Sequence, residues 1–135
     1  MPYTLNQAAN SMAIAEREWG VGQTIQFTHF TSCIGVLAKV KGQNEVIGVH
    51  LVLIDNQSNP FTAEVVTLIN SVLTSRNYDP ATVIIIGQIA YWEKSATVPY
   101  QTLLNTLPPV STYQLGDGTY GATVNTAGQI ELTYV

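Results

Sequence analysis

The fold follows from residues 34–54, which read IGVLAKVKGQNEVIGVHLVLI. Two apolar runs rich in β-branched residues, 34–40 and 46–54, flank the polar segment 41–45, which contains a glycine. Runs of this kind predict strands, and a short polar segment with a glycine predicts the loop that joins them. We therefore expect an antiparallel hairpin with one strand on each side of the loop.

The chain after this hairpin contains further predicted helices and strands. An apolar stripe with a proline in its first turn predicts a helix over residues 60–75. Residues 83–86 form the least polar run and predict a strand in the centre of the sheet. Residues 98–107 predict a short helix that two prolines end, and residues 120–125 and 129–134 alternate as a closing hairpin.

The N-terminal part of the chain predicts one helix and one strand. Residues 4–7 read Thr-Leu-Asn-Gln, a capping box, and apolar residues then recur near helical spacing, which predicts a helix over residues 5–18 ended by Gly20. Residues 24–30 alternate as a half-buried strand does. These elements predict one α+β domain over residues 1–135, with mostly antiparallel or mixed β-sheets in a sandwich-like arrangement flanked by two to three helices.

The composition excludes several classes of partner. The 135 residues are 46% apolar and 10% charged, so the chain can bury one core. The formal net charge is -4 and Lys and Arg do not cluster, so we expect no nucleic-acid partner. No apolar run approaches the roughly 20 residues of a membrane helix, and a single cysteine excludes an intrachain disulfide. We expect a cytoplasmic protein, or an effector secreted without a standard signal peptide.

Cys33 and His50 lie on the two strands of the predicted hairpin. Facing residues of an antiparallel hairpin have numbers with a constant sum, so a loop centred just after Lys41 places the two directly opposite each other. A loop centred just after Gly42 places them one diagonal step apart on the same face, with β-carbons about 5–8 Å apart in either register. A loop with an odd number of residues, such as 41–45, places them on opposite faces unless its boundary slips or a bulge intervenes.

A thiol beside an imidazole is a common nucleophile. A free thiol has a pKa of about 8.5, so His50 is needed as a base to convert Cys33 to thiolate at neutral pH. Backbone amides at the chain break around Thr31 and Ser32 are candidates to stabilise an oxyanion or contact substrate. Free cysteines are also among the most buried residue types, so packing is the competing interpretation of Cys33, and His29 is the rival base.

Two motifs resemble a known enzyme family. Residues 31–36, TSCIGV, and residues 48–53, GVHLVL, resemble the Gly-Ser-Cys and later Ala-His segments of the chemoreceptor glutamine deamidase CheD. Residues 115–124 and 128–132 look like the closing glycine-rich hairpin of that family. The resemblance covers roughly residues 24–135 and implies a CheD-like fold, shared in its core with the catalytic domain of the cytotoxic necrotizing factors.

The resemblance implies a cofactor-free reaction. In that family a Cys nucleophile and a His base, here Cys33 and His50, hydrolyse a glutamine side chain of a protein substrate to glutamate. The family's third residue is a Thr six positions before the Cys, where this chain has Phe27. Either Thr28 takes that role or a backbone carbonyl, such as that of Phe27, orients the imidazole, as in the necrotizing factors. Such departures suggest a toxin-like effector.

These observations lead to two classes of function. The leading hypothesis is a protein glutamine deamidase whose partner is a protein with a reactive glutamine, and which needs neither cofactor nor metal. The alternatives are a non-catalytic binding or inhibitor module on the same scaffold and another cysteine acyl hydrolase. Residues 116–122 match the dinucleotide fingerprint Gly-x-Gly-x-x-Gly-Ala, but a hairpin follows instead of the helix that this motif needs, so we expect no nucleotide.

Overall fold

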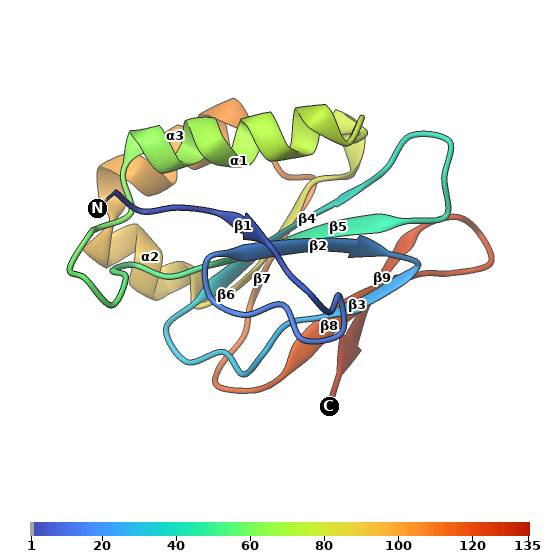
Figure 1. The fold of residues 1–135 in the computed structure, drawn as a ribbon, viewed down its shortest axis with the longest axis horizontal. Helices are drawn as coiled ribbons and strands as arrows, with labels where there is room; N and C mark the ends of the chain where they lie inside the picture. The colour runs from blue at the N-terminus through green and yellow to red at the C-terminus, as the bar shows by residue number, and fades with distance from the viewer. Residues whose placement is uncertain (1) are drawn as a thin grey trace.

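Helices and two β-sheets form three layers in the computed structural model, which describes residues 2–135 (Figure 1). The strands are β1 (Asn6–Gln7), β2 (Glu18–Gly22), β3 (Thr24–Gln26), β4 (Ile34–Lys39), β5 (Val46–Leu51), β6 (Ile84–Gly87), β7 (Ser111–Gln114), β8 (Tyr120–Val124) and β9 (Ile130–Tyr134). The helices are α1 (Ala63–Ser75), α2 (Ile89–Ser95) and α3 (Thr97–Thr106), and a short 3-10 helix covers Pro80–Thr82. The predicted α+β class is confirmed.

The predicted hairpin lies at the centre of the larger sheet. Its strand order is β1-β2-β5-β4-β6-β7, so β4 and β5 are the two middle strands. Strand β6 is antiparallel to β4 and parallel to β7, which makes the sheet mixed. The prediction of a central strand at residues 83–86 is therefore corrected: β6 is paired on both sides, but it lies next to the edge strand β7.

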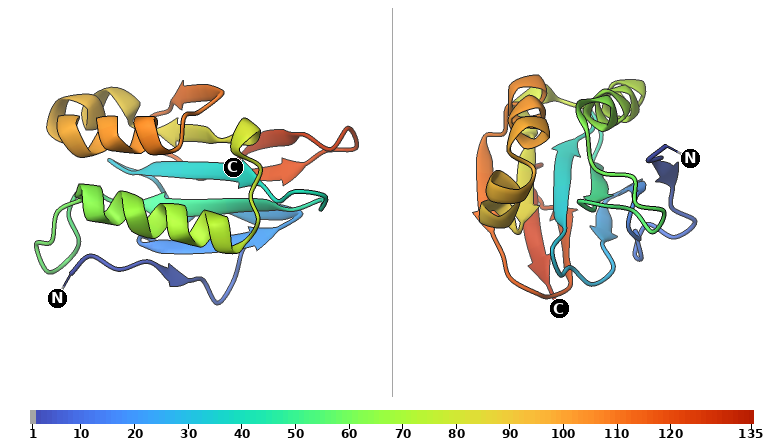
Figure 2. Two further views of the ribbon diagram at one scale, coloured as in Figure 1. Left: turned by 90° about the horizontal axis from the view of Figure 1, so that it is seen from above. Right: turned by 90° about the vertical axis from the view of Figure 1, so that its left-hand side faces the viewer.

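The second sheet, in the order β3-β8-β9, packs on the face of the hairpin opposite the helices (Figure 2). Small residues make room for it. A Cβ at Gly48 would overlap the side chain of Ile25 in β3, and a Cβ at Gly35 would lie 2.9 Å from the Phe27 ring. On the other side, α1 buries Val65, Val66, Ile69 and Leu73, the apolar stripe expected of a helix that covers a sheet.

Most other predicted elements are confirmed. Helices α1 and α3 match the predictions over 60–75 and 98–107, and β8 and β9 form the closing hairpin. The strand predicted over 24–30 ends at Gln26 and continues only as isolated bridges at Phe27 and Phe30. Helix α2 was not predicted from the sequence.

The helix predicted over residues 5–18 is wrong. The Asn10 side chain accepts a hydrogen bond from the Met12 N–H at 2.9 Å and turns the chain there. The Glu18 side chain accepts one from the Ala15 N–H at 2.9 Å, and Glu18 begins strand β2, which pairs with β5. Side-chain bonds to the local backbone and pairing with the sheet outweigh the helical spacing of the apolar residues.

Gly87 brings the end of β6 against the start of β4. Its φ is +119°, and a Cβ there would overlap the Cys33 carbonyl oxygen and lie 2.9 Å from Ile34 Cα. We expect Gly87→Ala to lower the free energy of unfolding by about 2–4 kcal/mol, measured by urea denaturation, because both neighbours are backbone atoms. Gly42→Ala is the matched control: its φ is +71° but no atom lies within 4 Å, so we expect a loss of only about 1 kcal/mol. Equal losses would show that the contact with Cys33 is unimportant.

Candidate active site

The register of the hairpin places Gly35, two residues after Cys33, opposite His50. Ile34 pairs with Leu51 and Gly35 pairs with His50, so paired residues have numbers that sum to 85. This is the diagonal register, one of the registers that the sequence left open, with a loop of even length between the strands. Paired residues of an antiparallel hairpin share a face, so Gly35 and His50 share one, and Cys33 directly precedes β4, two residues before Gly35.

This shared face points toward the smaller sheet. The Gly35 Cβ direction meets the Phe27 and Phe30 side chains. The His50 ring lies between the same two aromatic residues, with centroid distances of 5.5 Å to Phe27 and 4.7 Å to Phe30. The imidazole is therefore fixed in orientation by apolar packing on this face.

His50 is held as a neutral imidazole with one free ring nitrogen. Its side chain is fully buried, and Nδ1 lies 2.9 Å from the Ile14 carbonyl oxygen. Because a carbonyl only accepts, Nδ1 carries the proton and Nε2 has the lone pair. Nε2 is buried and has no hydrogen-bond partner within residues 2–135. Burial lowers the pKa of His50, although the Ile14 carbonyl and the Glu16 carboxylate oppose this. A neutral imidazole in this state has a lone pair on Nε2 that can accept a proton.

Cys33 is a buried thiol beside a carboxylate. It is 1% exposed, and Sγ donates a long hydrogen bond to Glu16 Oε2 at 3.8 Å. Burial raises the pKa of Cys33 to about 11, a contact with the Thr31 backbone opposes the shift, and the Glu16 charge adds to it. No hydrogen bond joins the thiol to His50 among the described side chains. The resting pair is therefore a thiol and a neutral imidazole.

Residues 14–17, here called the covering segment, lie over this pair. Ile14 bonds to the His50 ring, and the Arg17 N–H donates to the His50 backbone carbonyl at 2.8 Å. Arg17 has a positive φ of 63°, a conformation that costs a non-glycine residue energy and is kept here by these contacts. Glu16 thus reaches the thiol from a segment that contacts with His50 hold at Ile14 and at Arg17. This segment lies within the helix predicted over residues 5–18, so the sequence did not identify Ile14 and Glu16 as site residues.

The other predicted site residues surround the pair without touching His50 through their side chains. Thr28 donates its backbone N–H to the Ile14 carbonyl at 2.9 Å, the same oxygen that holds Nδ1. The carbonyl that orients His50 is therefore that of Ile14, rather than that of Phe27. His29 is exposed, whereas His50 is buried.

Thr31 and Ser32 line a shallow pocket together with Gln88, Tyr91 and Asp117, and Cys33 is not part of this lining. The Ser32 carbonyl accepts a hydrogen bond from the Trp92 ring N–H at 2.7 Å. The Cys33 carbonyl accepts one from the Gln88 N–H at 3.1 Å. Helix α2 thus fixes the backbone on either side of the Ser32–Cys33 peptide, which positions this turn for contact with a ligand.

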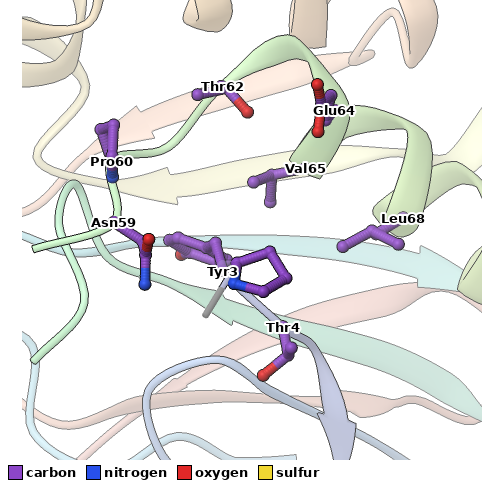
Figure 3. A pocket seen from close by; sticks show the side chains of 9 residues that line it. Tyr3, Thr4, Asn59, Pro60, Thr62, Glu64, Val65 and Leu68 are labelled. Atoms are coloured by element: carbon purple, nitrogen blue, oxygen red, sulfur yellow. The ribbon is translucent and has the colours of Figure 1, made fainter. Parts of the chain in front are cut away.

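A further pocket, lined in part by Tyr3, Pro60 and Leu68, lies between the N-terminal segment and the start of α1 (Figure 3). Its lining is mostly apolar, and Glu64 is its one charged residue within the described chain. It contains neither Cys33 nor His50. Shape alone therefore does not locate the reactive pair.

The shifted pKa values of His50 and Cys33 make the stability of the fold depend on pH. The pKa of His50 is lower in the folded protein than its ordinary 6.5, so the unfolded chain takes up a proton first and stability falls as pH drops below about 6.5. The pKa of Cys33 rises from 9.0 to about 11, so the unfolded chain ionises first and stability falls as pH rises above about 9. We expect urea unfolding to show a maximum between these limits. Cys33→Ser should flatten the change between pH 9 and 10, and an unchanged slope would contradict the assignment.

No family model matches this chain, and no curated protein is significantly similar to it. Within residues 2–135, no three His, Cys, Asp or Glu side chains lie close enough together to hold a metal ion. No helix of this range is long and apolar enough to cross a membrane.

Proposed function

We propose that this protein is a cysteine hydrolase that deamidates a glutamine side chain of a protein substrate. The observation that carries the proposal is the buried, unpartnered Nε2 of His50, in a site where Ile14 contacts the His50 ring and Glu16 contacts the Cys33 thiol. A buried polar atom without a partner costs about 1–3 kcal/mol. Native proteins have few such atoms, and a catalytic role is one explanation for them. The resemblance to the CheD family adds the substrate, a glutamine amide.

The reaction uses only the two side chains and water. His50 Nε2 takes the thiol proton, and Cys33 Sγ attacks the carbonyl carbon of the glutamine amide. The imidazolium then protonates the leaving nitrogen, the C–N bond breaks, ammonia departs and a thioester remains. His50 next takes a proton from water, which attacks the thioester, and the C–S bond breaks to give glutamate and the free thiol. Ile14 keeps the proton on Nδ1 throughout, so Nε2 performs every transfer.

The site fits a reducing compartment. A thiol nucleophile is inactivated by oxidation, and the chain has no second cysteine with which to form a protective disulfide. We place the activity in the cytoplasm, either of the producing cell or, for a delivered effector, of its target cell.

The test is a direct assay of deamidation. Glutamine-containing peptides and candidate proteins are incubated with the enzyme, and ammonia release and the Gln-to-Glu mass shift are measured. We expect Cys33→Ser to abolish both signals, and His29→Ala, which changes the exposed histidine, to leave both unchanged. Activity that survives Cys33→Ser would overturn the proposal.

The burial of Cys33 favours a second candidate, a non-catalytic binding module. A thiol that is 1% exposed with a raised pKa is also what simple packing produces. The two candidates differ in the rate at which iodoacetamide alkylates the folded protein. An activated thiol reacts in the native state and loses that reactivity when His50 is replaced, whereas a packed thiol reacts only on unfolding.

A further inference from the structure

Both reactive side chains are closed to solvent in this structure. Cys33 is 1% exposed and His50 is 0% exposed. A thiolate attacks a carbonyl carbon only when the two atoms approach to about 3–3.5 Å. A substrate therefore reaches Sγ only after part of the cover over the thiol has moved, and the groups that form this cover control access to the site.

Two exposed residues contact the buried thiol. Glu16 Oε2 lies 3.8 Å from Sγ, and Thr31 interacts with the thiol through its backbone and its side chain. Glu16 and Thr31 are both exposed, whereas Cys33 is buried. Because exposed residues here contact a buried atom, they lie between Sγ and the solvent.

The two covering residues differ in how firmly they are held. Helix α2 fixes the turn that carries Thr31, because the Trp92 ring N–H donates to the Ser32 carbonyl at 2.7 Å. The Glu16 side chain has one hydrogen bond within residues 2–135, the long one from Sγ, and a thiol is a weak donor. Exposed side chains change rotamer within picoseconds to nanoseconds. Glu16 is therefore the part of the cover that moves at the least cost.

The backbone that carries Glu16 is a tight turn. The Glu18 N–H donates to the Ala15 carbonyl at 3.0 Å, and the Glu18 carboxylate accepts from the Ala15 N–H at 2.9 Å. Arg17, the third residue of this turn, has a φ of 63°, a strained conformation of the kind found at active sites and switch regions. The turn holds residue 16 beside the thiol, so the rotamer of the Glu16 side chain decides whether the thiol is covered.

We propose that Glu16 is an autoinhibitory gate, whose side chain covers Cys33 in the resting protein and is displaced by a substrate that binds at the place of its carboxylate. The inference rests on the proposed function and adds the regulation of its site. In the closed position the carboxylate blocks the approach to Sγ, and its charge disfavours the thiolate. Both effects end when the side chain turns outward. The thiol thus becomes nucleophilic only when the site is open, which limits its oxidation at rest.

The experiment measures two alkylation rates on each variant. Iodoacetamide and a fluorescein-linked iodoacetamide react with the same thiolate and differ in bulk, so the ratio of their rates cancels any change in the thiolate fraction. Glu16→Ala removes the side chain, whereas Glu16→Met removes the charge and keeps the length. We expect the ratio of the bulky to the small reagent to rise about fivefold in Glu16→Ala and to stay within about twofold of the wild type in Glu16→Met. Glu64→Ala, at an exposed position of α1, is the control and should change neither rate.

The same variants separate this inference from the proposed function. On a glutamine peptide, Glu16→Ala should have a KM about fivefold lower than Glu16→Met, because the substrate no longer displaces a side chain. If no variant hydrolyses any peptide but Glu16→Ala alone admits the bulky reagent, the deamidase proposal fails and the gate stands. If Glu16→Ala and Glu16→Met have the same ratio of alkylation rates, Glu16 is not a gate, whether or not the protein hydrolyses glutamine.

Discussion

Replacing His50 by leucine is expected to lower glutamine hydrolysis by about 10²–10⁴-fold, the range that general-base catalysis contributes. The same change should leave the free energy of unfolding within about 1 kcal/mol of the wild type, or raise it. Leucine has a similar volume and removes the buried Nε2 that has no partner. The Ile14 carbonyl that bonded to the ring keeps its bond from the Thr28 N–H. Steady-state kinetics and urea denaturation on the same preparation measure both effects.

A large loss of hydrolysis without a loss of stability would identify His50 as a catalytic group. An imidazole that only stabilises the fold would cost several kcal/mol when removed, and activity would then fall because the protein unfolds. His29→Leu changes the exposed histidine and should alter neither quantity. A His50→Leu protein that is folded and still fully active would exclude His50 as the base.

The hairpin could be predicted because the decisive interactions are local, whereas its register could not. Two apolar runs flank a short polar loop, but the sequence does not fix which loop residues are paired, and the register found pairs Gly35 with His50. Helix α1 is likewise marked by its apolar stripe, and the end of α3 is marked by the two prolines that follow it. Helix α2 is only seven residues long and buries just Ile89 and Trp92, so its period is too short to be recognised.

The parts of the site that could not be predicted depend on contacts distant in sequence. Ile14 reaches His50 across 36 residues, and Glu16 reaches Cys33 across 17. Both lie in the segment whose apolar spacing predicts a helix. The spacing does not reveal that the Ile14 N–H bonds to the Gln26 carbonyl. This bond places the segment beside the second sheet, where it cannot form a helix. The candidate nucleophile and base could therefore be recognised as residue types, while the groups that contact them could not.

The second large effect is expected at Glu16. Glu16→Gln should make the Cys33 thiol about tenfold more reactive toward iodoacetamide at neutral pH. The Glu16 carboxylate accepts a hydrogen bond from the thiol, and its negative charge disfavours the thiolate. Glutamine keeps the shape and removes the charge. The pKa of Cys33 should then move down from about 11, and each unit of decrease gives about tenfold more thiolate.

Hydrolysis should increase less than alkylation in the same variant. Glu16 also raises the pKa of His50, so its removal makes the imidazole a weaker base toward the thiol and toward the attacking water. Glu45→Gln, in the loop at the other end of the hairpin, is the control and should change neither rate. An alkylation rate that stays constant in Glu16→Gln would mean that the carboxylate does not contact the thiol in solution. An alkylation rate that rises while hydrolysis falls would assign Glu16 two opposed roles, lowering the reactivity of the thiol and strengthening the base.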